Sequence, residues 1–235
     1  PLFVLDFSVS KEVQNMFGRI APKYDRANRV LSFGTDIRWR KKAVQLCNLQ
    51  EGDAVLDVAC GTGDLSFALK KAVGDGPVTG SDFTPEMLAC AEAKSKQRGV
   101  DIAWQQADAQ DLPFEDGQFA AATISFGIRN VDDPAKGVAE MARCVKPGGR
   151  VVVLEFGQPK GLWGASYRFY SKHVMPRVGG LLTGDREAYE YLPRTAAAFP
   201  AGDKFLQLMG DAYPFTELEA IPLSGEIAWL YVGTV

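Results

Sequence analysis

The sequence predicts an α/β fold: a doubly wound, mostly parallel sheet with an antiparallel hairpin at the C-terminal end. Three observations support this prediction. Strand-like segments alternate with helix-like segments between residues 53 and 156, which is the pattern of βαβ units. A turn with two glycines, Gly61 and Gly63, joins the first of these strands to a helix. The segment 218–233 is typical of two strands around a tight turn at residues 224–225.

The predicted elements follow one another in a regular order. Strand-like segments cover residues 53–60, 76–83, 100–109, 119–131 and 150–156. Helix-like segments cover residues 64–73, 84–99 and 133–145. For the second helix we expect Thr84 as N-cap, Pro85 as first helical residue and Gly99 just after the end. The third helix is expected to stop at the KPGG segment, residues 146–149. Ligands of such sheets bind at the carboxyl ends of the strands.

Length and composition fit a single domain. With 235 residues, of which 46% are hydrophobic and 23% charged, the chain can bury a full core. We expect one domain over residues 1–235, with a helical cap at residues 1–50 and a helical insertion at residues 157–200. The net charge of −3 argues against general nucleic-acid binding, which needs a basic surface. Residues 1–42 nevertheless carry nine basic and four acidic residues, so the early segment is basic.

The cysteines and the apolar segments exclude other classes of protein. The four cysteines are widely spaced, form no C-x-x-C pair and have His173 as their only histidine companion, so no metal site is expected. The opening segment, residues 1–9, lacks a basic start and contains Asp6, which is unlike a signal peptide. No apolar run reaches the roughly 18 residues that a membrane span needs. We therefore expect a cytoplasmic protein of a reducing compartment.

The turn within VLDVACGTGDLSFAL, residues 55–69, predicts a nucleotide-like ligand. Gly61 and Gly63 allow the backbone to approach a ligand closely at a helix N-terminus. A dinucleotide fingerprint would need a third glycine where Ser66 stands, which argues against NAD. Asp82, about 19 residues after Gly63 and at an exposed strand end, is placed to accept hydrogen bonds from both hydroxyls of a ribose.

Two other acids follow strand ends, Asp57 and Asp108. Acids at three successive strand ends favour a cationic adenosine ligand over a pyrophosphate, because carboxylates attract cations and repel phosphates. S-adenosylmethionine carries an ammonium and a sulfonium group and fits this description. We expect Phe83 and Met87, which follow Asp82, to contribute to the same binding site.

Several motifs resemble one branch of the class I methyltransferases. They are LDVACGTGDLS (56–66), ADAQDLPF (107–114), ISFGIRNVDD (124–133), VKPGGR (145–150), VLEFGQP (153–159) and YRFYSKHVMPRVGGLLTGD (167–185). From residue 16 to the last strand the chain resembles the demethylmenaquinone and 2-polyprenyl-6-methoxy-1,4-benzoquinol methyltransferase family. The most specific motifs are SFGIRNV, HVMPRVG and AYEYLPRTAAAFP. Ala59 departs from the glycine of many class I enzymes, and Glu226 stands where a small residue is expected.

The resemblance implies a class I methyltransferase fold, S-adenosylmethionine as methyl donor and S-adenosylhomocysteine as product. It implies cofactor contacts from Thr62, Asp82, Asp108, Ala109 and Ser125. From the residues alone, Asp82 is alternatively a helix-capping side chain, and Asp108 a cap of the turn before Pro113. Asp57 has a water-linked role at the methionine ammonium or accepts hydrogen bonds from loop amides.

C-methylation of a quinol needs an electron-rich ring carbon. Loss of a phenolic proton supplies the electron density, and an unperturbed phenol loses its proton near pH ~10. Arg129 and Asn130 directly follow the fourth strand. Arg129 offers a fixed positive charge to a phenolate, and Asn130 offers an oriented amide for a water or a ring oxygen. The alternative is a structural arginine that pairs with Asp132 or Asp133.

Four further residues are candidates with a bland alternative. His173, within YSKHVMPRV, is a candidate general base because histidine serves this role near neutral pH. Its alternative is a cap at a helix end before Pro176. The resemblance places Phe17, Tyr24 and Asp25 over the mouth of the active site, so these three are candidate substrate contacts. Their alternative is ordinary packing. The insertion 157–200 is expected near the same mouth.

Residues 160–177 mix aromatic and basic side chains, a composition suited to a membrane interface. The alternative is a helix packed on its own domain with a solvated face. The predicted function is C-methylation of a polyprenylated quinol by an enzyme that contacts the inner face of the membrane peripherally. Demethylmenaquinol is favoured as the substrate over the quinol precursor of ubiquinone. Methylation of another lipid or aromatic acceptor, and a non-catalytic nucleotide-binding module, are the alternative functions. Homo-oligomers and complexes of quinone-biosynthesis enzymes stay open.

Overall fold

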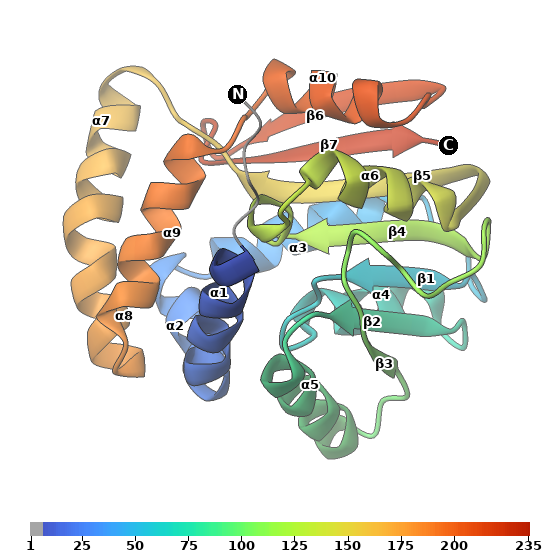
Figure 1. The fold of residues 1–235 in the computed structure, drawn as a ribbon, viewed down its shortest axis with the longest axis horizontal. Coiled ribbons are helices and arrows are strands. Elements are labelled where there is room, and N and C mark those ends of the chain that lie inside the picture. Colours follow the sequence, from blue (N-terminus) through green and yellow to red (C-terminus); the bar gives the residue numbers. More distant parts are fainter. Residues whose placement is uncertain (1–6) are drawn as a thin grey trace.

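The computed structural model describes residues 7–235 and contains one seven-stranded sheet (Figure 1). The strand order is β3-β2-β1-β4-β5-β7-β6. The strands are β1 (Val55–Val58), β2 (Val78–Asp82), β3 (Ala103–Gln106), β4 (Phe119–Ser125), β5 (Val145–Phe156), β6 (Glu217–Leu223) and β7 (Ala228–Thr234). All pairs from β3 to β5 are parallel, whereas β7 is antiparallel to both β5 and β6. The predicted fold class is confirmed.

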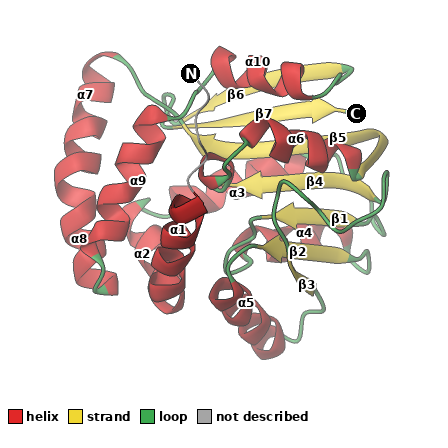
Figure 2. Ribbon diagram, viewed as in Figure 1, coloured by secondary structure: helices red, strands yellow, loops and turns green. Residues whose placement is uncertain are grey.

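Thirteen helical segments occur in the described part of the chain (Figure 2). They are α1 (Phe7–Ile20), the 3₁₀ turn η1 (Ala21–Lys23), α2 (Tyr24–Leu31), α3 (Thr35–Leu46), α4 (Asp64–Val73), α5 (Pro85–Arg98), the 3₁₀ turn η2 (Ile128–Asn130), α6 (Pro134–Arg143), α7 (Gly161–Phe169), the π turn η3 (Tyr170–Val174), α8 (Met175–Thr183), α9 (Arg186–Ala198) and α10 (Asp203–Ala212). The predicted ends of α5 are confirmed: Thr84 is the N-cap, Pro85 opens the helix and Gly99 closes it with a φ of +62°.

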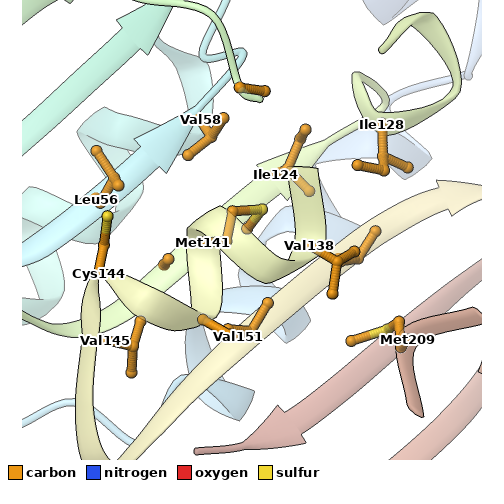
Figure 3. Packing of buried hydrophobic residues seen from close by; sticks show 14 of the residues in the cluster. Leu56, Val58, Ile124, Ile128, Val138, Met141, Cys144, Val145, Val151 and Met209 are labelled. Atoms are coloured by element: carbon orange, nitrogen blue, oxygen red, sulfur yellow. The ribbon is translucent and has the colours of Figure 1, made fainter. Parts of the chain in front are cut away.

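Apolar residues cover both faces of the sheet. On one face, side chains of α6 and α10 pack on β1, β4 and β5, with Met141 and Val138 lying over Ile124 (Figure 3). On the other face, α3 and α4 contribute Trp39 and Leu69 to a second cluster. Because both faces are covered, the central strands are mainly apolar on both sides, which is the pattern that the sequence showed.

A third apolar cluster lies beyond the carboxyl ends of the parallel strands. Met16, Ile20 and Leu31 of α1 and α2 pack there against Met175 and Tyr189 of α8 and α9. In Figure 1 the arrowheads of β1 and β4 point toward this group of helices. We call α1, α2, α7, η3, α8 and α9 the helical cap. Two segments far apart in the sequence therefore cover the same edge of the sheet.

Several predicted boundaries were wrong. Strand β4 ends at Ser125 rather than continuing to residue 131, because Phe126 has a φ of +57° and cannot extend a strand. Strand β3 is shorter than predicted. Helix α6 ends at Arg143, and the KPGG segment lies inside β5, where the pairing with β4 shifts register.

The closing hairpin and the helix around His173 also differ from the prediction. Four residues, 224–227, separate β6 from β7, and Ser224, Gly225 and Glu226 all have positive φ. The left-handed φ of +69° at Glu226 explains why a small residue is expected there. His173 is not at a helix end, because α7 continues through η3 into α8. The wider π turn accommodates Pro176, which lacks a backbone N–H.

Residues 1–6 lie outside the described residues, and with them most of the segment judged unlike a signal peptide and the start of the predicted cap at residues 1–50. In the part of the chain that is described, no helix combines the length and the apolar character needed to cross a bilayer.

Candidate active site

Two adjoining cavities lie where the sheet meets the helical cap. The first, the glycine-turn cavity, has a volume of about 530 Å³, and its lining includes Gly61, Asp82, Phe83, Met87, Asp108, Ala109, Ser125 and Asn130. The second, the aromatic cavity, has a volume of about 590 Å³, and its lining includes Trp39, Arg129, Phe156, Trp163, Tyr167, Tyr170 and Tyr191. Phe17, Tyr24 and Phe126 line both. Both volumes are in the range of small-molecule sites.

The glycine turn runs through left-handed backbone. Ala59, Gly61 and Gly63 have φ values of +48°, +56° and +85°. The value at Ala59 explains why many related turns have glycine there, since an alanine in this region is strained. The two glycines differ in their surroundings. A Cβ on Gly63 would lie 2.6 Å from the Trp104 ring, whereas a Cβ on Gly61 would meet nothing within 4 Å and Gly61 lines the cavity. Gly61 is therefore the glycine that leaves room for a ligand.

Asp82 joins the glycine turn to the start of α5. Its Oδ2 accepts a hydrogen bond from the Gly61 backbone N at 2.8 Å, and its Oδ1 accepts one from the Thr84 backbone N at 2.8 Å. The expectation of an exposed strand end was wrong: Asp82 is only 9% exposed, and burial raises the pKa of its carboxyl. Each oxygen keeps a second lone pair, so the carboxylate still accepts hydrogen bonds from a ligand in the cavity.

Asp57 and Thr62 lie beneath the glycine turn rather than in the glycine-turn cavity. Asp57 accepts hydrogen bonds from the Ser66 hydroxyl at 2.5 Å and from the Thr123 hydroxyl at 2.9 Å, so its partners are hydroxyls rather than loop amides. Burial raises the pKa of the Asp57 carboxyl to about 6. Both Asp57 and Thr62 border a small cavity of about 40 Å³ under the turn. Through these two hydrogen bonds Asp57 ties β1 to α4 and β4.

The remaining predicted cofactor residues line the glycine-turn cavity. Phe83 and Met87 supply apolar walls, and Ala109 lies beside Asp108. Asp108 also caps its own turn, since Oδ1 accepts a hydrogen bond from the Gln110 backbone N at 2.9 Å. The Ser125 hydroxyl is buried and has no hydrogen-bond partner.

The residues of the glycine-turn cavity fit an adenosine cofactor that carries positive charge. Two acids, Asp82 and Asp108, face a cavity with apolar walls and an open glycine. The unpartnered Ser125 hydroxyl at its edge needs a polar ligand atom, because buried hydroxyls are normally hydrogen-bonded. Among residues 7–235, no three His, Cys, Asp or Glu side chains gather in a way that would hold a metal ion.

A network of charges fastens the helical cap to the glycine turn. Asp25 of α2 accepts a hydrogen bond from the Thr62 hydroxyl and pairs with Lys94 of α5 at 2.6 Å. Lys94 also pairs with Asp64, at 3.1 Å, and Arg29 reaches Asp64 at 3.2 Å. Asp25 lines the small cavity under the turn and is not among the residues of the aromatic cavity. The structure therefore places Asp25 against the glycine turn, whereas Phe17 and Tyr24 lie at the junction of the two large cavities.

Arg129 enters the aromatic cavity from η2. Its Nη1 donates hydrogen bonds to Glu155 Oε1 at 2.8 Å and to the Phe126 carbonyl at 2.6 Å, and its side chain is only 2% exposed. For a structural role of Arg129 the sequence suggests an ion pair with Asp132 or Asp133. The ion pair is instead made with Glu155 of the neighbouring strand. The Arg129 Nε is buried and has no hydrogen-bond partner. Nε is therefore an unsatisfied donor in the wall of the aromatic cavity.

Tyrosines surround this guanidinium. Burial raises the pKa of three tyrosines, Tyr24, Tyr167 and Tyr191, and that of Tyr167 reaches about 12. The positive charge of Arg129 opposes the increase in each of them. These phenols are therefore protonated at neutral pH. The Tyr191 hydroxyl donates a hydrogen bond to Asn130 Oδ1 at 3.1 Å, which orients the Asn130 amide at the edge of the glycine-turn cavity.

The structure does not bring His173 to either large cavity. His173 lies on η3, is exposed, and packs its ring 5.1 Å from that of Phe169. Cys60 lies in the glycine turn, where burial raises the pKa of its thiol well above the ordinary value. A thiol in this state is a poor nucleophile.

Sequence reasoning missed Glu155, Tyr167 and Tyr191 as residues of the site. A signal existed for Glu155: it is a single acid at the end of the apolar run VVVLE, where an unpaired charge is not tolerated. Both tyrosines lie in motifs that carry the resemblance, YRFYSKHVMPRVGGLLTGD and AYEYLPRTAAAFP, but no local pattern shows that two helices of the cap bring them to the cavity of Arg129.

Comparisons with known proteins show the family to which the chain belongs. Residues 6–234 match the ubiE/COQ5 methyltransferase family. The chain is 50% identical over 224 residues to the ubiquinone/menaquinone biosynthesis C-methyltransferase UbiE of Bdellovibrio bacteriovorus, covering 95% of each chain. It is 48% identical over 219 residues to the demethylmenaquinone methyltransferase of Thermus thermophilus, covering 93% of this chain and 99% of that protein.

Solved structures share the fold. A SAM-dependent methyltransferase of Thermotoga maritima, described as a possible histamine N-methyltransferase, superposes with a TM-score of 0.64 at 23% identity, over 94% of this chain and 98% of that chain. A SAM-dependent methyltransferase of Aquifex aeolicus superposes with a TM-score of 0.62 at 18% identity, over 83% and 89% of the two chains. With half of its residues shared with UbiE over nearly the full length, the chain belongs to the ubiE/COQ5 methyltransferase family.

Proposed function

We propose that this protein transfers the methyl group of S-adenosylmethionine to a ring carbon of a polyprenylated quinol in respiratory quinone biosynthesis. The observation that carries the proposal is the pair of adjoining cavities. One is acidic and built on a glycine turn, and the other is aromatic and has the free Nε of Arg129 buried at its wall. The names of the relatives agree with this assignment.

The cofactor is assigned to the glycine-turn cavity. Asp82 accepts hydrogen bonds from the ribose, Asp108 and Ala109 border the adenine between apolar walls from Phe83 and Met87, and Gly61 leaves room for the methionine portion. Ser125 gains the hydrogen-bond partner that it lacks. When bound, the cofactor supplies an electrophilic methyl group and leaves as S-adenosylhomocysteine.

The quinol head is assigned to the aromatic cavity, with its reacting carbon at the junction formed by Phe17, Tyr24 and Phe126. Arg129 donates a hydrogen bond from Nε to the quinol oxygen and stabilises the phenolate that forms there when the phenolic proton passes to solvent. Asn130, oriented by Tyr191, holds a water or the second ring oxygen. The aromatic walls exclude water and hold the ring in line with the methyl group.

Demethylmenaquinol is the proposed acceptor. The Thermus and Deinococcus relatives are named for demethylmenaquinone, and the Bdellovibrio relative for both quinones. Because a polyprenylated quinol resides in the bilayer, the proposal includes a peripheral position of the enzyme at the inner face of the membrane.

A methylation assay tests the proposal. Purified protein is given S-adenosylmethionine and a short-chain demethylmenaquinol kept reduced, and the product is analysed by mass spectrometry and NMR. We expect one new methyl group on a ring carbon. Binding is titrated in parallel with S-adenosylhomocysteine and NADH, and only the former should bind. A methyl group on oxygen, or tighter binding of NADH, would refute the assignment.

A further inference from the structure

Exposed apolar side chains gather on one part of the molecule. Among the described residues, seven of the eight large apolar side chains that are exposed belong to α2, α3, α7, α8 or the turn between α2 and α3. The most exposed are Leu162 at 90%, Leu181 at 87% and Phe33 at 84%. We call the following six residues the entrance face: Phe33, Ile37, Leu162, Trp163, Phe169 and Leu181.

The entrance face is continuous with the aromatic cavity. Phe33 and Trp163 belong to both. The Phe33 ring lies 6.1 Å from the Tyr170 ring, and the Tyr170 hydroxyl donates a hydrogen bond to the Leu31 carbonyl at 2.8 Å. These contacts hold the turn between α2 and α3 against the helices α7 and α8. The apolar surface therefore extends from the outside of the protein into the cavity assigned to the quinol head.

Helices α7 and α8 present their apolar residues along one side. They form a single column through the π turn η3, at the outer edge of the molecule (Figure 1). Leu162 and Phe169 are seven residues apart, about two helical turns. Leu181 follows Phe169 by twelve residues, about three turns once the extra residue of the π turn is allowed for. The three side chains thus form one exposed stripe.

The backbone of the turn between α2 and α3 directs Phe33 outward. Phe33 has a φ of +52° and Gly34 a φ of +73°. A bulky residue in left-handed backbone is strained, and an exposed phenyl ring adds an unfavourable contact with water. Backbone strain and exposure of the ring both oppose the observed conformation in water. Contact of the ring with an apolar phase would remove the cost of exposure.

Basic residues border the entrance face on both of the segments that form it. Arg38, Lys41 and Lys42 of α3 and Lys160, Arg168, Lys172 and Arg177 beside or within the α7–α8 column are all exposed. No Asp or Glu occurs from residue 157 to residue 184. The single acid among residues 26–42, Asp36, is buried and paired with Arg40 at 2.5 Å. This surface is positive although the whole chain has a net charge of −3.

We propose that the entrance face docks on the surface of a bilayer with anionic headgroups, so that the polyprenyl chain passes directly from the lipid into the aromatic cavity. The apolar residues insert between the headgroups, and the basic residues contact them. Aromatic residues at the rim, Phe33 and Trp163, lie at the level of the headgroups. This inference rests on the proposed function and names the surface and the partner for it.

Vesicle flotation with the full chain tests the inference. We expect co-flotation with vesicles of phosphatidylcholine and phosphatidylglycerol, weaker binding to pure phosphatidylcholine, and release by high salt, which screens surface charge. The double variant Leu162→Ser/Leu181→Ser should lower the bound fraction about tenfold or more, since two exposed leucines lose their insertion. Lys172→Glu should weaken binding to the anionic vesicles, whereas the matched control Lys71→Glu, exposed on α4, should not.

Two assays separate this inference from the proposed function. Methylation of a short-chain quinol in solution should be unchanged in the Leu162→Ser/Leu181→Ser variant, while methylation of a long-chain quinol embedded in anionic vesicles should fall in parallel with binding. Equal binding of wild type, variant and control, or association with another protein in place of vesicles, would overturn the docking surface. If the wild-type protein did not methylate the short-chain quinol in solution, that result would instead refute the proposed function.

Discussion

Glu155 Oε1 accepts a hydrogen bond from Arg129 Nη1 at 2.8 Å, and both side chains are almost completely buried. Glu155 also accepts from the backbone N of Phe156 at 2.8 Å. The ion pair fixes one end of the guanidinium and leaves Nε without a partner. Glu155 thus acts as a positioning residue, since it orients Arg129 and balances its charge in the cavity wall.

Breaking this pair should destabilise the fold. Arg129→Ala leaves a buried carboxylate without its counter-charge, which costs about 3–5 kcal/mol of unfolding free energy. The double variant Arg129→Gln/Glu155→Gln has no buried charge and should be closer to wild type. Urea unfolding of the single and double variants measures the difference. Equal destabilisation of the two would show that the pair is not coupled.

The same double variant separates chemistry from cofactor binding. Without the cation beside the quinol oxygen, we expect the methylation rate to fall about a hundredfold or more at neutral pH, with unchanged affinity for S-adenosylhomocysteine. Raising the pH should recover part of the rate, because the free quinol then ionises unaided. Single-turnover assays between pH 6 and 10 provide the measurement. Glu155→Gln alone, which keeps Arg129, should retain more activity and show a shifted pH profile.

His173→Ala is the control for that experiment, because His173 is exposed and outside both cavities. Its single-turnover rate and pH profile should match those of wild type. A dead His173 variant with normal folding and cofactor affinity would make the histidine the base and contradict the role given to Arg129.

Gly61 and Gly63 should respond differently to alanine. Gly61→Ala places a methyl group in open space at the cavity, so it should lower S-adenosylhomocysteine affinity more than stability, which falls by about 1–2 kcal/mol because of the left-handed φ. Gly63→Ala meets Trp104 and should chiefly destabilise the fold. Gly52→Ala is the matched control, with a φ of +87°, open space and no cavity. Calorimetry and urea unfolding on all three give the comparison.

Asp82→Asn should weaken binding of S-adenosylhomocysteine about 10- to 100-fold, because a charge-assisted hydrogen bond contributes about 1.5–3 kcal/mol. The asparagine keeps one acceptor for the backbone N of Gly61 or Thr84, so the fold should persist. The control is Asp53→Asn, because Asp53 accepts a hydrogen bond from the Gln50 backbone N at another turn. Calorimetric titration that finds equal affinities would remove Asp82 from the cofactor site.

Asp57 should make stability depend on pH. Burial raises its pKa from the ordinary value of 3.8 to about 6, so the folded state holds this proton more tightly than the unfolded state. Its contribution is fully present below pH ~4 and is lost as pH rises through about 6, by about 2–3 kcal/mol in total. Urea unfolding between pH 4 and 7 should therefore show wild type losing stability relative to Asp57→Asn. A constant difference would contradict the raised pKa.

Local patterns in the sequence determined the sheet and half of the site. Alternating apolar strands and helices predicted the doubly wound fold, because βαβ units place parallel strands side by side with right-handed crossovers. The glycine turn and Asp82 were predicted because they lie within one βαβ unit, where sequence spacing sets spatial distance. The hairpin was predicted, but not its turn, since Ser224 is held by hydrogen bonds from Trp39 and Trp163.

Only the tertiary structure decided the aromatic half of the site. Tyr167 comes from α7, Glu155 from β5 and Tyr191 from α9, and these elements meet because the helical cap folds over the sheet edge. The same folding excluded His173, which lies exposed on η3. Contacts between distant residues, such as Tyr191 and Asn130 at 61 positions apart, depend on how whole elements pack, and no local pattern of residue types encodes that packing.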